Sequence, residues 1–186
     1  NNDRAIAEFQ EYLHDYPEGA DRVAVRFALG DAQRALGRNL DARLTWTDLA
    51  RDIEHGKPDD ATAADQEIRA RALAEIPSTH GMPTPGNDAE LNLGVAAVKR
   101  FLAAYPSHPR AVRAAFDIGA AYLILGKTDQ ALEAFDRFLK REDFTAETEE
   151  ARKDLAELSM AATHSRGQLL QAQGKYNEAI AAWKGY

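Results

Sequence analysis

The feature that most constrains the fold is an internal repeat. Two stretches share a sparse set of positions: YPEGADRVAVRFALG at residues 16–30 and YPSHPRAVRAAFDIG at residues 105–119. Each starts with Tyr-Pro, reaches a phenylalanine eleven residues after the tyrosine (Phe27 and Phe116), and ends on an aliphatic residue followed by glycine. Self-similarity with a period of 20–50 residues is typical of solenoids and other repeat arrays. We therefore expect stacked similar units.

The clearest pattern lies in residues 108–141. Apolar side chains recur there at the i, i+3, i+4 and i+7 spacing of a helix face. Pro109 suits the first turn of one helix, and Gly126 suits its end. Thr128 or Asp129 could cap the helix that follows. This pattern predicts an antiparallel helix pair joined by a glycine turn, and the lack of alternating apolar runs predicts an all-α chain.

A second helix of this kind can be placed five times, starting from a small residue near its N-terminus. These residues are Ala5, Ala42, Gly94, Ala131 and Ala179, at spacings of 37, 52, 37 and 48. A large aromatic follows four residues later in four of them: Phe9, Trp46, Phe135 and Trp183. We expect Gly30 and Gly119 on the first helices to lie where a partner backbone passes close, and the aromatic rings to fill the remaining space.

The spacing predicts a single array over residues 1–186. Its units are a half repeat at 1–17, a repeat at 18–56, a degenerate repeat at 57–106, a repeat at 107–143 and a repeat at 144–186.

Two regions depart from the repeat. Residues 57–88 lack the aliphatic-glycine pair; Pro58 with Asp59 or Asp60 should start a helix there, and residues 77–88 should form a loop because they hold three prolines. The last repeat should have a long first helix from near Thr145, broken only weakly at Gly167.

Composition excludes several classes of protein. The net charge of −7 argues against nucleic-acid binding, which needs a basic face. The chain has no cysteine, so it has neither disulfides nor thiolate sites. No stretch approaches the eighteen apolar residues of a membrane span. We expect no nucleic-acid partner and no insertion into a membrane.

Motifs for chemistry are also missing. The five histidines are not within helical reach of one another, and no HExxH, GxSxG, P-loop or GxGxxG occurs. Acidic residues near expected helix starts are explained by the helix dipole. We therefore expect no catalytic residue, no metal and no cofactor. An enzyme with a site in loop 77–88 is the alternative that remains open.

The set of recurring small and aromatic positions, which we call the repeat skeleton, resembles the tetratricopeptide repeat (TPR). The positions that carry the likeness are Leu29-Gly30, Gly37, Ala42 and Trp46; Ile118-Gly119, Tyr122, Gly126, Ala131 and Phe135; and Gly174, Ala179 and Trp183. The family repeat is 34 residues, whereas the spacing here is 37. This lengthened form is similar to that of bacterial envelope proteins, such as outer-membrane assembly lipoproteins, and to arrays in large bacterial alpha-2-macroglobulin-like proteins.

The resemblance implies a right-handed α-solenoid whose first helices line a groove for peptides. The groove residues it suggests are Asp31, Arg34, Arg113, Asp117, Gln168 and Gln171. It implies a non-enzymatic scaffold that binds a protein or peptide segment in a bacterial assembly, in the periplasm or another extracytoplasmic compartment. The alternative is a structural spacer in a large envelope protein with no ligand of its own.

The ends of the sequence suggest a fragment. It starts at a second helix without its first helix, and it ends inside another second helix. We expect flanking repeats or domains of the same parent chain to cover apolar residues near the ends, namely Ile6, Phe9, Ile180 and Trp183.

Overall fold

The structure, a computed structural model, describes residues 2–56 and 61–184. Pro58, Asp59 and Asp60, expected to start a helix, lie outside the described residues. All regular structure in the described part is helical, as predicted. The chain divides into two compact units, residues 1–80 and 81–186, and the boundary falls inside the predicted loop 77–88.

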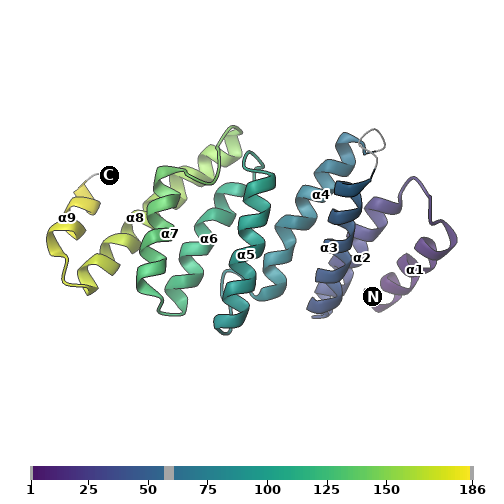
Figure 1. The fold of residues 1–186 in the computed structure, drawn as a ribbon, viewed down its shortest axis with the longest axis horizontal. Helices are drawn as coiled ribbons and strands as arrows, with labels where there is room; N and C mark the ends of the chain where they lie inside the picture. The colour runs from purple at the N-terminus through teal and green to yellow at the C-terminus, as the bar shows by residue number, and fades with distance from the viewer. Residues whose placement is uncertain (1, 57–60, 185–186) are drawn as a thin grey trace. The chain divides into compact units, whose positions relative to one another are not determined.

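The first unit consists of antiparallel helices that pack in chain order (Figure 1). Its elements are α1 (Asn2–Asp15), α2 (Arg22–Ala35), α3 (Asn39–His55), α4 (Ala63–Glu75) and the 3₁₀ helix η1 (Ile76–His80). Gly37 ends the turn between α2 and α3 in the left-handed conformation, at φ 74°, which suits a residue without a Cβ. α4 and η1 both pack against α3.

The second unit repeats the same plan. Its helices are α5 (Asp88–Ala104), α6 (Ala111–Ile124), α7 (Thr128–Lys140), α8 (Glu149–Ala172) and α9 (Tyr176–Lys184). Within this unit, the helix pairs α6–α7 and α8–α9 are the two most closely associated, and α6 also packs against α5 and α8. The predicted pair over residues 108–141 is therefore confirmed as α6 and α7.

One contact organises each complete helix pair. A glycine on the first helix lies against an aromatic ring on the second: Gly30 against Trp46, and Gly119 against Phe135. A Cβ built on Gly119 would fall 2.6 Å from Cδ1 of Phe135, closer than real Cβ atoms come to other atoms. The close approach was expected, but the atoms that approach belong to an aromatic ring and not to a partner backbone.

The third pair shows the same contact, which corrects our reading of α8. Gly167 was expected to break a long helix weakly, yet α8 is continuous and Gly167 lies against the indole of Trp183. Gly167 stands seven residues before the turn glycine Gly174, the same separation as Gly30 from Gly37. The glycine is needed for packing between helices.

Three predicted boundaries were wrong. Residues 76–80 form η1 instead of loop, because Pro77 cannot continue α4 and the Thr79 hydroxyl donates a hydrogen bond to the Ile76 carbonyl at 2.7 Å. α8 starts at Glu149, after Thr148, whose Oγ1 accepts from the Ala151 amide.

The third error concerns the start of α7. Its N-cap is Lys127, which makes no side-chain capping bond, and Thr128 and Asp129 lie inside the helix. A glycine turn stabilises the connection between α6 and α7 in place of a side-chain cap. Across Gly126, the Lys127 amide donates a hydrogen bond to the Tyr122 carbonyl at 2.9 Å.

The apolar residues near the ends differ in exposure. Ile6 is 5% exposed because it packs with Leu29 and Ala32 of α2, so the expectation that it would be poorly covered was wrong. Phe9 is half-buried against the same cluster. Ile180 and Trp183 on α9 are exposed by 46% and 39%.

Candidate functional site

The predicted groove residues Arg113 and Asp117 lie one turn apart on α6. Arg113 is exposed, while Asp117 is half-buried. Burial raises the pKa of Asp117 to about 6, and the positive charge of Arg113 opposes this rise. The pair therefore presents a cation next to a carboxyl group that water solvates poorly, which suits recognition of polar groups in a ligand.

Gln168 and Gln171 are exposed on α8, and α8 packs against α6. Each amide can both donate and accept hydrogen bonds, as recognition of a peptide backbone requires. These four residues of the second unit, on two neighbouring first helices, form the surface that we call the first-helix surface: Arg113, Asp117, Gln168 and Gln171.

Asp31 and Arg34 belong to the other unit and form a separate set. Both are exposed on α2. Arg34 Nε donates to Ser78 Oγ at 3.1 Å, and Arg34 Nη1 lies 4.0 Å from a carboxylate oxygen of Glu75. Arg34, which we expected to be available to a ligand, is thus already held by η1.

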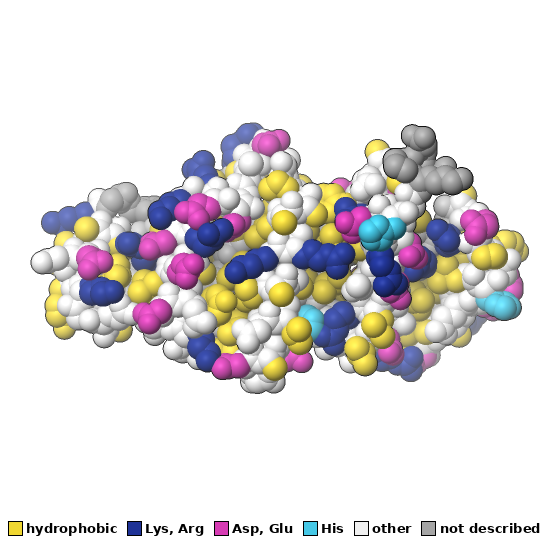
Figure 2. Space-filling view, in the orientation of Figure 1, with side chains coloured by type: hydrophobic (Ala, Val, Ile, Leu, Met, Phe, Trp, Pro, Cys, Tyr) yellow, Lys and Arg dark blue, Asp and Glu magenta, His cyan; other side chains and the backbone are white. Residues whose placement is uncertain are grey.

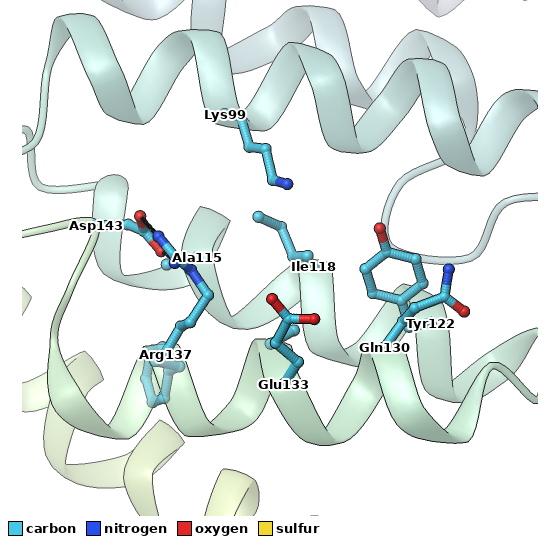
Figure 3. A pocket seen from close by; sticks show the side chains of 10 residues that line it. Lys99, Ala115, Ile118, Tyr122, Gln130, Glu133, Arg137 and Asp143 are labelled. Carbon is cyan, nitrogen blue, oxygen red and sulfur yellow. Dashed lines mark hydrogen bonds and ion pairs between the residues drawn. The ribbon is translucent and has the colours of Figure 1, made fainter.

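The other side of α6 faces a cavity that sequence reasoning missed. The cavity lies between α5 and α7 and has α6 as its floor, which contributes Ala115, Ile118 and Tyr122 (Figure 3). At 100° per residue, these three residues lie on nearly the opposite face of α6 from Arg113 and Asp117. Lys99 projects from α5, and Glu133 from α7 (Figure 3).

The cavity, of about 70 Å³, adjoins an open hollow of about 620 Å³. The two share Lys99, Glu133, Arg137 and Asp143 in their linings. We call the cavity and the hollow together the α5–α7 groove. No spacing rule could have found it, because its wall residues lie at positions that the repeat skeleton leaves free.

Two residues that line this groove, Arg137 and Tyr122, have pKa values raised by their surroundings. Arg137 is held by Asp143 and by Glu142, 3.1 Å away, and the hydrogen bond from Arg137 to Asp143 raises the Arg137 pKa above its usual range. Burial raises the pKa of Tyr122, and the nearby charge of Glu133 raises it further. The phenol therefore stays protonated and able to donate a hydrogen bond.

His80, the histidine in the predicted loop, is buried against another helix. Nη1 of Arg43 on α3 lies 2.8 Å from its ring nitrogens. Across residues 2–56 and 61–184, no three His, Asp or Glu side chains are grouped so that they could hold a metal ion. In the same part of the chain, no helix is both long and apolar enough to cross a bilayer.

Comparison with known proteins agrees with this architecture. A family model described as "Tetratricopeptide repeat" matches residues 89–145, which include α6, α7 and most of α5. No curated protein matches the chain.

Two solved structures resemble nearly the whole chain. Both contain nearly identical TPR-like repeats of a protein described as a kinesin light chain of Podosopora anserina. One has a TM-score of 0.57 with 15% identity and covers 98% of this chain and 84% of the other. The second, a single-substitution variant of that protein, has a TM-score of 0.56 with 15% identity and coverages of 99% and 84%. The fold class is thus an all-α solenoid of TPR-like helix pairs.

Proposed function

We propose that the chain is a non-enzymatic scaffold that binds an extended peptide segment of another protein on the first-helix surface. TPR repeats are generally protein–protein interaction scaffolds, and the match over residues 89–145 covers α6. The observation that carries the proposal is the arrangement on α6 and α8. A charged pair, Arg113 and Asp117, lies on a helix that packs against the one bearing two exposed amides.

The chemistry of this surface favours a polar peptide. Arg113 can form charge-assisted hydrogen bonds with a carboxylate, and Gln168 and Gln171 can pair with backbone amides. A nucleic acid is disfavoured because the chain carries a net charge of −7.

Site-specific photo-crosslinking in cells that express the protein tests the proposal. A photoreactive residue placed at Gln168 should yield an adduct with a partner protein, identified by mass spectrometry. The same residue at the exposed Leu93 on α5 is the matched control and should not yield that adduct. Adding Arg113→Glu should abolish the adduct at position 168.

Persistence of the adduct in the Arg113→Glu variant would contradict a role for the charged pair. The structural spacer is the second candidate, and it predicts no partner-specific adduct at any exposed position. The hydrogen bond from Arg34 to Ser78 supports the spacer for the first unit, because it leaves fewer polar groups available there for a ligand.

We further propose that the parent protein works in a bacterial assembly outside the cytoplasm, with flanking repeats or domains of the same chain. This placement rests on the 37-residue spacing and the Tyr-Pro stops at residues 16–17 and 105–106. Fractionation of cells that express the tagged parent protein tests it; recovery in the cytoplasmic fraction would overturn the placement without affecting the binding site.

A further inference from the structure

The α5–α7 groove lies on the opposite face of α6 from the first-helix surface, and it combines an apolar floor with charged walls. Ala115 and Ile118 of α6 supply the apolar part of the floor, and Phe138 of α7 borders it; none of the three is more than 7% exposed. Figure 2 shows apolar side chains at the surface over the region of α5 to α7, with basic and acidic side chains around them. Apolar surface beside charges strengthens electrostatic attraction, because less water screens the charges.

The cations of the groove differ in how they are neutralised. Arg137 is paired with Asp143 and Glu142. Lys99 on α5 and Arg141, directly after α7, both line the hollow, and neither side chain has a hydrogen-bond or ion-pair partner within the described part of the chain. Two unpaired cations therefore border one concavity of a chain whose net charge is −7.

Glu133 provides an acceptor on the opposite wall from Lys99 (Figure 3). Its side chain likewise makes no hydrogen bond or ion pair with a described residue. The carboxylates of Glu142 and Asp143 in the same lining are offset by their pairing with Arg137. Nucleic acid is disfavoured by the net charge of −7. A backbone N–H of an extended peptide can donate to Glu133.

The dimensions suit a short extended segment. The lining residues run from Gln130 on α7 to Arg141 directly after it, which at 1.5 Å per helical residue is about 16 Å. An extended chain rises about 3.3 Å per residue, so roughly five residues span this length.

We propose that the α5–α7 groove binds an extended, acidic protein segment in which an aliphatic side chain packs on Ala115, Ile118 and Phe138 and carboxylates pair with Lys99 and Arg141. This site is separate from the first-helix surface, so either proposal can fail without the other.

The test uses the full 186-residue chain and three defined pentapeptides. The first has one leucine flanked by aspartates, the second has lysines in place of the aspartates, and the third has glycine in place of the leucine. Each is titrated to millimolar concentration while the backbone amide signals are followed by NMR. We expect the first peptide to shift the amide signals of residues around the groove, including Lys99, Ile118 and Arg141.

The other two peptides should bind at least about tenfold more weakly, because one loses the charge pairing and the other the apolar contact. Lys99→Glu and Arg141→Glu should each weaken binding of the aspartate peptide about five- to tenfold. Both side chains are exposed, so the variants should fold, which circular dichroism checks. Arg4→Glu, a matched charge reversal at an exposed residue of the first unit, should leave binding unchanged.

Three results would each overturn the proposal. The aspartate peptide could bind the Lys99→Glu variant as tightly as the unchanged protein, or the lysine peptide could bind as tightly as the aspartate peptide. The aspartate peptide could also fail to shift any amide signal in the groove at millimolar concentration. A loss caused by Arg113→Glu alone would also overturn it and would assign the acidic peptide to the first-helix surface.

Discussion

Gly167 on α8 lies directly against the indole ring of Trp183 on α9, sixteen residues later in the chain. Gly30 has the same relationship to Trp46, and Gly119 to Phe135, across the same separation. In each pair the missing Cβ lets a large ring lie close against the first helix. The three contacts differ in burial, however, since Phe135 is 1% exposed and Trp183 is 39% exposed.

This difference predicts the cost of adding one methyl group. Gly119→Ala should lower the free energy of unfolding by about 2–3 kcal/mol, because the buried Phe135 ring cannot move away. Gly167→Ala should lower it by only about 1 kcal/mol, because Trp183 can shift toward solvent. Urea unfolding measures both. Gly86→Ala is the matched control: a Cβ there meets nothing within 4 Å, so stability should be unchanged or slightly raised. Equal losses for Gly119→Ala and Gly86→Ala would refute the ring-packing account.

The two tryptophans of the chain report on separate units. Trp46 is fully buried in the first unit, and its Nε1 donates to the Phe27 carbonyl at 3.2 Å; Trp183 lies in the second unit and is partly exposed. In Trp183→Phe, the remaining emission should be blue-shifted and resist acrylamide. In Trp46→Phe it should be red-shifted and readily quenched. Similar quenching constants for the two variants would contradict the exposures seen here.

Asp117 should make stability depend on pH. Its pKa in the folded protein is raised to about 6 from 3.8, so between these values the folded state keeps a proton that the unfolded chain releases. Stability therefore falls as pH rises from about 4 to 6, and the loss is complete above that range. Asp117→Asn should stabilise the protein by about 1–2 kcal/mol at pH 7 and by little at pH 4.

Urea unfolding at both pH values, followed by Trp183 in the Trp46→Phe background, measures this effect. Glu157→Gln on the exposed surface of α8 removes the same charge and serves as the control. A gain from Asp117→Asn that is the same at pH 4 and pH 7 would show that burial of the carboxylate is not its cause.

Arg166 occupies the position that Leu29 and Ile118 hold in the other pairs, directly before the packing glycine. Its Nε donates to Oδ1 of Asp136 on α7, and the pair is partly exposed. Replacing such an ion pair by an apolar contact is often neutral or stabilising. Arg166→Leu should therefore keep or raise the thermal midpoint, whereas Arg166→Ala should lower it by a few degrees. A large loss in Arg166→Leu would show that the ion pair itself is required.

The same residue explains what the sequence could and could not predict about the fold. The helix pairs were predictable because Gly37, Gly126 and Gly174 close their turns at a fixed distance from a buried small residue, and local spacing encodes both. Gly167 was wrongly predicted to break its helix. It follows Arg166 and not an aliphatic residue, so the pattern seen at Leu29-Gly30 and Ile118-Gly119 could not be recognised there. The start of η1 was missed since it depends on Ser78 and Thr79 bonding to nearby backbone carbonyls.

The candidate site was less predictable. The sequence placed Arg113 and Asp117 on a helix face, because helical periodicity alone determines that. It could not show that Arg34 is taken up by Ser78, forty-four residues away, nor that Lys99 and Arg141 border one concavity. Those relationships depend on how separate helices pack, and the residues involved are free of the repeat pattern.

The sixteen-residue separation between glycine and ring has a consequence for tolerance to insertion and deletion. One extra residue between Gly30 and Trp46, even in the turn, would displace the indole from its glycine and leave both surfaces exposed. The connections between pairs carry no such requirement, and the packing glycines of successive complete pairs stand 89 and 48 residues apart. Each pair therefore has a fixed internal length, and we expect inserted residues to be tolerated better in the connections between pairs than within a pair.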